Sequence, residues 1–355
     1  MPSMPTRQLG KNGPEIPRIG YGTMGLSISY GVPLSDEERF AILDHAHEIG
    51  ETFWDTSDFY GDSEELLGKW FARTGKRSDV FLATKFGGVK IGANGFGFRG
   101  DAEYVSEACE NSLKRLGIDY IDLWYPHRLD GSTPVEHIVA EMVRMKEQGK
   151  IRHLGLCEVS AETLRRAYAV HPIAAVQVEY SPFTTDIEEN GLLAACRELG
   201  VAVVAYCPLS RGLLSGQIKN RDGFGAADVR AYYPRFSEEN LARNLALVQE
   251  LEKIAAEKGC TPGQLTLAWL LSQGDEIFPI PGTKNIKYLD ENCAAANVEL
   301  MPDEISRIRV LVDKHTSYGA RYAPGHDGGL FSNTPAVKDY KKSKIPEHVE
   351  IIGTV

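Results

Sequence analysis

Short apolar runs alternate with longer amphipathic segments along most of this chain. Continuous apolar character over four to six residues is typical of strands that are buried on both faces. The pattern predicts eight such strands, at Ile19–Gly22, Phe53–Thr56, Phe81–Lys85, Ile121–Tyr125, Ile151–Leu156, Val176–Glu179, Ala202–Tyr206 and Ile277–Ile280. A short hairpin is expected before them, around Gly10-Lys11-Asn12-Gly13.

Amphipathic helices are predicted between the strands. They lie at Ser35–Glu48, Ser63–Ala72, Ala102–Leu116, Pro134–Gln148, Ala161–Ala169, Gly191–Leu199, Leu241–Glu257 and near Lys287–Ala296. Ser35 and Ser63 precede acidic residues and are the expected N-caps of two of these helices. Gly117 follows a basic last turn, as a C-terminal glycine does.

Eight strand–helix units predict an α/β protein with a single (β/α)8 TIM barrel, an N-terminal hairpin and long rim loops. We expect one domain over residues 1–355, with the barrel at about 6–312 and a C-terminal tail at 316–355. The alternative is a doubly wound open sheet, which would usually carry a Gly-rich turn after its first strand. The segment Tyr21-Gly22-Thr23-Met24-Gly25 is not such a turn.

Three segments between these elements have unusual length or composition. Cys207–Asn240 and Thr316–Val355 exceed normal loops, and loops of that length are usually functional or disordered. Gly95–Gly100 spells G-x-G-x-x-G, but nine residues separate it from Lys85, whereas a dinucleotide-binding turn follows its strand at once. We therefore expect a flexible rim loop there.

Composition and charge exclude several classes of protein. The 355-residue chain is 43% hydrophobic, and no apolar run approaches the roughly 20 residues that span a bilayer. Met1–Thr6 lacks the pattern of a signal peptide, so a cytoplasmic protein without a membrane partner is expected. A formal net charge of -10 argues against a nucleic-acid partner.

The cysteines and histidines do not favour a metal site. The six cysteines are scattered without a C-x-x-C pair, and we expect reduced thiols, several of them in the core. His45 and His47 stand two apart on a predicted helix and so point to different faces.

Four polar residues stand at or just beyond the ends of three successive predicted strands. Asp55 ends an apolar strand, and Tyr60 follows five residues later on the loop before a helix. Lys85 closes the next strand, and His127 follows Leu123-Trp124-Tyr125-Pro126. Any one of them alone has a structural explanation, such as a cap or a satisfied core histidine. Together, with Ser63–Gly68 after Tyr60, they resemble the Asp-Tyr-Lys-His tetrad of the aldo-keto reductase superfamily.

The four side chains suit the reduction of a carbonyl group, which needs a hydride donor at carbon and a proton donor at oxygen. Tyr60 is the expected general acid, although the unperturbed pKa of tyrosine is near 10. The ammonium of Lys85 lowers that pKa, and Asp55 keeps Lys85 charged and in place. A neutral His127 orients the carbonyl by a hydrogen bond and is a possible proton relay.

The resemblance extends over roughly Thr6 to Val312 and implies an NADPH site. In such proteins the counterpart of Gln177 contacts the nicotinamide amide, that of Tyr206 stacks on its ring, and the following backbone wraps the pyrophosphate. Thr283 and Lys284 would lie at the adenosine phosphate, near a helix N-terminus. The implied cofactor residues are Thr23, Met24, Asp55, Cys157, Glu158, Gln177, Tyr206, Cys207, Pro208, Leu209, Ser210, Arg211, Gly212, Pro281, Gly282, Thr283, Lys284, Tyr288, Glu291 and Asn292.

Two positions depart from the family pattern. Cys157 and Glu158 stand where many members have Ser-Asn, and Glu158 could accept a hydrogen bond from the nicotinamide amide instead. Tyr288 stands where many members place an Arg on the 2′-phosphate, so NADP selectivity would rest on Thr283, Lys284 and Lys287. Both features resemble a subgroup with fungal pyridoxal-type reductases and plant and bacterial relatives.

Three functions remain open at this point. The first is an NADPH-dependent reductase of a small aldehyde or ketone. The second is a nucleotide-sensing regulatory subunit that resembles potassium-channel β subunits, and the third is a sugar-phosphate barrel, which would not explain Tyr60 with Lys85. Neither the substrate nor the oligomeric state can be predicted. The choice of substrate is expected to depend on residues of the rim, namely Met24–Pro33, Trp54, Gly87–Arg99, Trp124, Arg128, Tyr318, Tyr322 and Phe331. The two tryptophans either line an apolar pocket or pack in the barrel.

Overall fold

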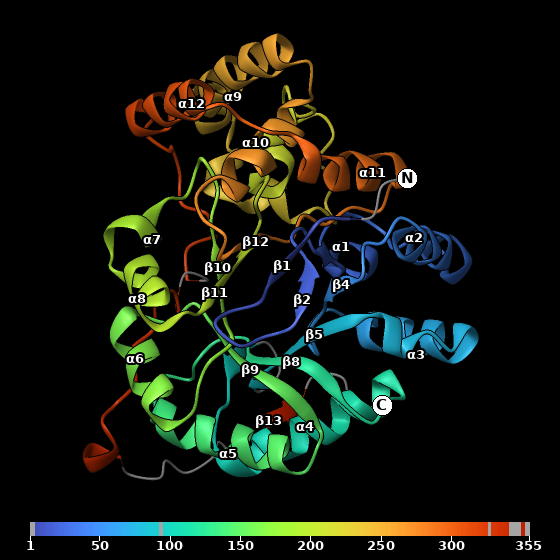
Figure 1. Ribbon diagram of the computed structural model, residues 1–355, viewed down its shortest axis with the longest axis vertical. Coiled ribbons are helices and arrows are strands. Elements are labelled where there is room, and N and C mark those ends of the chain that lie inside the picture. The colour runs from blue at the N-terminus through green and yellow to red at the C-terminus, as the bar shows by residue number, and fades with distance from the viewer. Residues whose placement is uncertain (1–3, 92–94, 326–327, 341–348, 352–355) are drawn as a thin grey trace.

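Eight parallel strands form the centre of the protein (Figure 1) in the computed structural model, which describes residues 4–91, 95–325, 328–340 and 349–351. They are β3 (Tyr21–Gly22), β4 (Phe53–Asp55), β5 (Phe81–Phe86), β8 (Ile121–Pro126), β9 (Ile151–Cys157), β10 (Ala175–Glu179), β11 (Ala202–Tyr206) and β12 (Ile277–Pro279). Their order in the sheet follows the sequence. The backbone N–H groups of Gly20 and Gly22 donate to the carbonyls of Pro279 and Pro281, at 2.9 and 3.2 Å, and so join the first strand to the last. The predicted (β/α)8 barrel is confirmed.

Helices surround the strands (Figure 1). Those that were predicted are α2 (Asp36–Glu48), α3 (Ser63–Thr74), α4 (Ala102–Leu116), α5 (Val135–Glu147), α6 (Ala161–Val170), α8 (Leu192–Leu199), α9 (Glu238–Lys258) and α11 (Ile286–Ala294). Helices that were not predicted are α1 (Met24–Ser27), α7 (Asp186–Glu189), α10 (Pro262–Leu271) and α12 (Pro302–Lys314). Ser35 and Gly117 occupy the expected cap positions of α2 and α4.

Ser63 is not the N-cap that the sequence suggested. It is the first residue of α3, which starts after Asp62, and the carboxylate of Asp62 is held by Arg39 at 2.8 Å rather than capping the helix. The Ser63 hydroxyl accepts a hydrogen bond from Thr56 at 2.7 Å and lies 3.1 Å from the Thr23 hydroxyl. It therefore ties α3 to the carboxyl end of β4.

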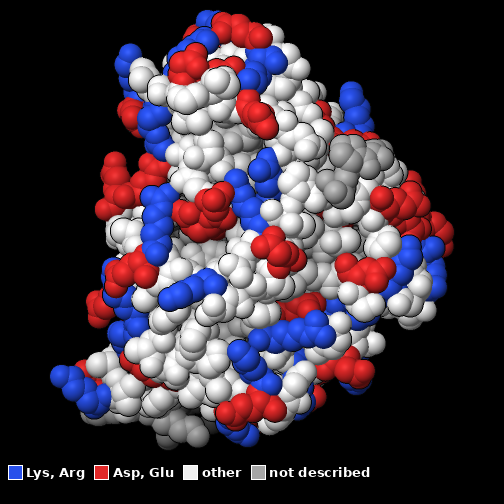
Figure 2. Space-filling model, in the orientation of Figure 1, with Lys and Arg blue, Asp and Glu red and all other residues white. Residues whose placement is uncertain are grey.

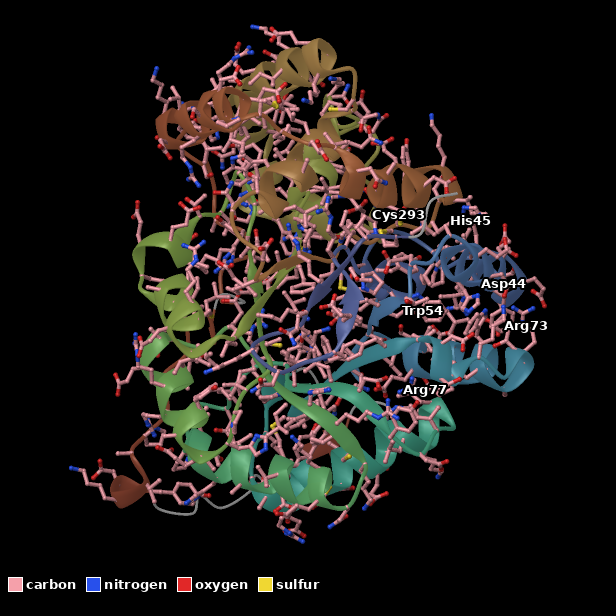
Figure 3. The ribbon with its side chains drawn as sticks, in the orientation of Figure 1. Asp44, His45, Trp54, Arg73, Arg77 and Cys293 are labelled. Carbon is pink, nitrogen blue, oxygen red and sulfur yellow. The ribbon has the colours of Figure 1, made fainter. Side chains whose placement is uncertain are left out.

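Alternate residues of each strand point to opposite sides of the barrel wall. Phe53, Ala83 and Leu123 pack with one another in the barrel interior. Their neighbours Trp54, which is labelled in Figure 3, and Trp124 belong to the core between strands and helices. Trp54 contacts Trp70 of α3 at a ring distance of 4.7 Å. Both tryptophans are fully buried, so they pack in the barrel wall and do not line a substrate pocket.

The N-terminal hairpin closes the end of the barrel at which the strands begin. It consists of β1 (Thr6–Gln8) and β2 (Glu15–Pro17), as predicted, and Lys11 N–H donates to the carbonyl of Gly200 at 2.7 Å. Leu9 and Ile16 pack on the interior core that includes Phe53. The opposite end, where the strands finish, is left for the polar residues.

The rim segment expected to be a flexible loop is a second hairpin. Strands β6 (Gly88–Ile91) and β7 (Gly95–Phe98) pair with each other and with β13 (Val349–Ile351) from the tail. The G-x-G-x-x-G sequence therefore starts in an antiparallel strand, which confirms that it is not a dinucleotide-binding turn. Two of its glycines, Gly95 and Gly97, occupy strand positions opposite Ile91 and Val89.

The long segment after β11 is also ordered, as three short helices: η2 (Ser210–Ser215), η3 (Val229–Tyr232) and η4 (Pro234–Phe236). The described part of the tail is tied to the rim at several points. Asn244 Nδ2 donates to the Tyr318 carbonyl at 2.9 Å, and Ser332 N–H donates to the carbonyl of Glu158 at 2.7 Å. Both segments therefore contribute to the end of the barrel at which the strands finish.

Candidate active site

A buried ammonium joins two of the predicted site residues. Lys85 Nζ donates to Asp55 Oδ1 at 2.5 Å and to the Thr56 carbonyl at 2.7 Å, and lies 3.4 Å from the hydroxyl of Tyr60. Gln177 Nε2 donates to the other Asp55 oxygen at 2.7 Å. Asp55 and Lys85 are interior-facing residues at the ends of neighbouring strands, which is why the fold brings them together.

The surroundings fix the charge of this pair. Burial opposes a charge on Lys85, but the attraction of Asp55 outweighs it and raises the pKa of Lys85 above its usual value. Burial also raises the pKa of Tyr60, to about 12, and Lys85 opposes that rise without cancelling it. Lys85 therefore acts on the pKa of Tyr60 in the expected direction, but the loss of water around the phenol has the larger effect.

His127 completes the group of four. Its ring lies edge-on to the ring of Tyr60, with a centroid distance of 5.5 Å, and its Nδ1 is 3.1 Å from the hydroxyl of Ser57. Burial, followed by the positive charges of Lys85 and Arg128, lowers the pKa of His127 well below its usual range. The imidazole is therefore neutral at physiological pH.

A cavity of about 350 Å³ opens next to these residues. Asp55, Tyr60, Gln177 and Tyr206 form its inner wall, and it extends outward between the segment after β11 and the segment after β12. The lining residues are Gly22, Met24, Gly25, Tyr30, Asp55, Tyr60, Gln177, Tyr206, Cys207, Pro208, Leu209, Arg211, Gly212, Arg230, Ile280, Pro281, Gly282, Thr283 and Lys284.

Most of the sequence-predicted cofactor residues therefore share one cavity, but seven lie outside its lining. They are Thr23, Cys157, Glu158, Ser210, Tyr288, Glu291 and Asn292. Sequence reasoning missed Gly22, Gly25, Tyr30, Arg230 and Ile280, although Tyr30 lies in a rim loop noted for substrate choice and Arg230 in the segment whose length indicated a function. Among the described residues, no group of three or more His, Cys, Asp and Glu is arranged to hold a metal ion.

The outer part of the cavity is bordered by two segments that meet. Residues 28–31 and 225–229 contact each other through an antiparallel bridge between Tyr30 and Asp228. Val229 N–H donates to the Ser29 carbonyl at 3.0 Å, and Lys284 Nζ donates to the Tyr30 carbonyl at 2.8 Å. The ammonium of Lys284 thus stands at the junction of both segments with the cavity.

The start of the long segment combines a tight turn with positive side chains. Cys207, Ser210 and Arg211 have φ angles of 48°, 47° and 55°, and Gly212 has a φ of 91°. The turn is held by its own backbone, because the N–H groups of Ser210 and Gly212 donate to the carbonyls of Cys207 and Leu209, at 2.7 and 3.0 Å. Arg211, Arg230 and Lys284 add three positive side chains to the same cavity, whose lining contains a single carboxylate, that of Asp55.

Tyr206 is connected to the tail through its hydroxyl. The hydroxyl donates to Glu158 Oε1 at 2.7 Å and lies 2.9 Å from the hydroxyl of Tyr322. Glu158 is fully buried, with Arg321 3.7 Å from its second oxygen. Glu158 therefore holds Tyr206 and Arg321 here, instead of lining the cavity where it was expected to meet the nicotinamide amide.

Comparisons with known proteins agree with this geometry. Residues 18–313 match the Aldo/keto reductase family. The chain is 51% identical over 327 residues to an aldo-keto reductase of Strobilurus tenacellus, which covers 90% of this chain and 95% of that protein. It is 49% identical over 338 residues, 94% and 98% of the two chains, to a Schizosaccharomyces pombe aldo-keto reductase whose name specifies NADP(+).

Two solved structures share the fold. One is a thermostable aldo-keto reductase in complex with the inhibitor epalrestat, with a TM-score of 0.71, 30% identity, and coverage of 87% of this chain and 100% of that one. The other is the glycerol dehydrogenase from Gluconobacter oxydans, with a TM-score of 0.79, 26% identity, and coverage of 90% and 98%.

Proposed function

This chain belongs to the aldo/keto reductase family and is an oxidoreductase, and we propose that it reduces a small aldehyde or ketone to the alcohol with NADPH. The observation that carries the proposal is the contact of Lys85 with both Asp55 and Tyr60 at the wall of a cavity. A phenol beside a buried ammonium is suited to giving a proton to a carbonyl oxygen and taking it back.

The cavity fits a nicotinamide dinucleotide with a 2′-phosphate. Its inner end offers the amide of Gln177 and the aromatic ring of Tyr206, and its outer part gathers the cations Arg211, Arg230 and Lys284. NADPH has the nicotinamide ring at one end and carries its phosphate groups beyond it, so these parts of the cofactor match the two parts of the cavity. Gln177 and Tyr206 would hold the nicotinamide, and residues 207–212 with Lys284 the phosphates.

Each side chain has a distinct task in the reaction. When bound, NADPH supplies the hydride. Tyr60 donates the proton to the carbonyl oxygen, and Lys85 stabilises the phenolate that remains. Asp55 keeps Lys85 charged and fixed, while neutral His127 orients the carbonyl oxygen toward the phenol.

The experiment is turnover of a panel of aldehydes and ketones, followed by consumption of NADPH or NADH. Tyr60→Phe should lower the rate by about 10²–10⁴-fold, the usual contribution of a general acid, while NADPH binding stays nearly intact. Tyr168→Phe on α6 is the matched control and should keep wild-type rates. A Tyr60→Phe enzyme that retains a tenth of wild-type turnover would contradict the assignment. Tight NADPH binding without turnover of any carbonyl would favour the sensing subunit instead.

A further inference from the structure

A buried hydroxyl faces the inner nitrogen of the His127 ring. Ser57 Oγ lies 3.1 Å from His127 Nδ1 and 3.2 Å from Asp58 Oδ1, and it accepts a hydrogen bond from the Phe59 N–H at 3.1 Å. Ser57 is 0% exposed and Asp58 is 4% exposed, in the turn that follows β4. The role proposed for His127 does not explain why Ser57 and Asp58 lie in line behind its ring.

The number of hydrogens available to Asp58, Ser57 and His127 limits how these three groups can hydrogen-bond to one another. A serine hydroxyl has one hydrogen and two acceptor positions, and the Phe59 N–H occupies one of those positions. In one arrangement Ser57 donates to an ionised Asp58 and accepts from a hydrogen on His127 Nδ1. In the other arrangement a neutral Asp58 donates to Ser57, and Ser57 donates to a bare Nδ1. If both contacts of Ser57 are hydrogen bonds, the ionisation of Asp58 decides which His127 nitrogen carries the hydrogen.

The surroundings of Asp58 favour its neutral form. Asp58 forms no ion pair within the described ranges, and an isolated carboxylate in a protein interior is costly. Burial, followed by the nearby Glu64 carboxylate, raises the pKa of Asp58 well above its usual value. The Arg115 guanidinium and the hydrogen bonds from Ser57 and the Gly87 N–H oppose this rise without cancelling it, and Arg115 is engaged with Glu64 at 2.6 Å.

We propose that Ser57, supported by the carboxyl of Asp58, is a positioning residue that fixes His127 in the tautomer with its hydrogen on Nε2. Nδ1 then accepts from Ser57, and Nε2–H is left to donate to the carbonyl oxygen. No described residue hydrogen-bonds Nε2, and this nitrogen is not one of the fully buried atoms without a partner, although His127 lies outside the lining of the cavity. This use of Nε2–H rests on the proposed reductase function, whereas the tautomer is a property of the free protein.

The tautomer can be observed directly by ¹⁵N NMR of protein labelled at histidine. His127→Gln identifies the His127 signals among those of the nine histidines. We expect an unprotonated Nδ1 and a protonated Nε2 in the wild type near neutral pH. Ser57→Ala should give a mixture of tautomers and lower kcat by about 10- to 100-fold, the usual cost of losing a group that orients a functional histidine.

Two variants of Asp58 separate positioning from packing. Asp58→Asn keeps a donor N–H beside Ser57 and should retain the wild-type tautomer, whereas Asp58→Leu removes the donor and should lose it. Thr266→Val removes another buried hydroxyl, on α10, and should leave both the His127 signals and kcat unchanged.

The proposal is overturned if the wild-type hydrogen lies on Nδ1, or if Ser57→Ala lowers kcat with the tautomer unchanged. The wild-type spectrum alone decides the first outcome, so a Ser57→Ala protein that fails to fold does not block the test. If the wild type binds NADPH but reduces no carbonyl, the proposed function fails, and the spectrum still tests the Ser57–His127 contact separately.

Discussion

At the scale of single residues, the buried ammonium of Lys85 links charge to reactivity. Lys85 is fully buried beside Asp55 and Tyr60, and it is the largest influence that lowers the Tyr60 pKa. In the proposed mechanism the phenolate form of Tyr60 is the base for alcohol oxidation, so the rate should rise with pH toward the Tyr60 pKa of about 12. Lys85→Met raises that pKa further, and the rise in rate should therefore move to higher pH, with a lower rate at every pH below it.

The measurement is the pH dependence of alcohol oxidation in both proteins. Lys85→Met also leaves Asp55 as an uncompensated buried charge, which typically costs about 3–5 kcal/mol of stability. The double variant Lys85→Met/Asp55→Asn removes that charge and should regain stability without regaining activity. An unchanged pH profile in the single variant would show that Lys85 does not act on Tyr60.

The sequence was sufficient to predict that the four candidate residues lie together, because they resemble the family's tetrad and a barrel gathers the ends of its strands. The sequence was not sufficient to predict how burial and neighbouring charges together set the pKa values of these residues. The pKa of Tyr60 depends on how much water the fold removes, which the spacing of Asp55 and Lys85 does not reveal. Ser57 was likewise passed over, because its contact with His127 joins residues 70 positions apart.

At the scale of elements, the ends of β9 and β10 depend on the C-terminal tail. Glu158 and Glu179 are buried at those ends, and Arg321 lies between them at 3.7 and 3.6 Å. Glu179 has a second cation nearby, Arg235 at 3.5 Å. For Glu158, the described residues provide one cation within 4 Å, and it is Arg321. Glu158 in turn holds the hydroxyl of Tyr206, so the tail is connected to the cavity wall.

Arg321→Leu should therefore destabilise the protein strongly. Removal of one partner from a buried ion pair costs about 3–5 kcal/mol of stability. Because these contacts are longer than direct hydrogen bonds, we expect the free energy of unfolding, measured by chemical denaturation, to fall by about 3 kcal/mol. The double variant Arg321→Leu/Glu158→Gln should recover part of it. Arg307→Leu breaks the exposed pair with Glu257 and should cost much less, because water screens a surface ion pair. Equal losses in the two single variants would contradict a supporting role of the tail.

The helices and strands also show which elements the sequence pattern can predict. The strands and amphipathic helices were predictable because each has its own periodicity. Helix α10 was missed because most of its residues are buried, which leaves no polar face to mark it. The hairpin of β6 and β7 was missed because its glycines resemble a loop and its third partner, β13, lies more than 250 positions later.

At the scale of the whole molecule, the net charge of -10 opposes an anionic cofactor. Acidic and basic side chains are interspersed on the face shown in Figure 2, so the field there is mixed rather than of one sign. None of the described helices has the combination of length and apolarity needed to cross a membrane. Binding of a phosphorylated cofactor therefore depends on cations placed locally, and Arg211, Arg230 and Lys284 line the cavity.

Lys284 is the best placed of these for a 2′-phosphate, because it follows Thr283 at the outer part of the cavity. A charge-assisted contact contributes about 1.5–3 kcal/mol, which corresponds to about a ten- to hundred-fold change in affinity. Lys284 gives up its hydrogen bond to the Tyr30 carbonyl when it turns to a phosphate, so Lys284→Ala should raise the Kd for NADPH toward the lower end of that range. The Kd for NADH should stay nearly unchanged, since NADH has no 2′-phosphate.

The control for this prediction is a lysine that changes the net charge equally but lies elsewhere. Lys253 on α9 pairs with Glu250 at the surface, and Lys253→Ala, like Lys284→Ala, takes the formal charge from -10 to -11. If the field of the whole protein governs binding, both variants should weaken NADPH equally, and added salt should change the two Kd values together. If the local contact governs binding, only Lys284→Ala weakens the binding of NADPH. The exposed Lys287 then contributes less than Lys284, because it lies outside the cavity lining. NADH that binds the wild type as tightly as NADPH would show that neither lysine selects the phosphate.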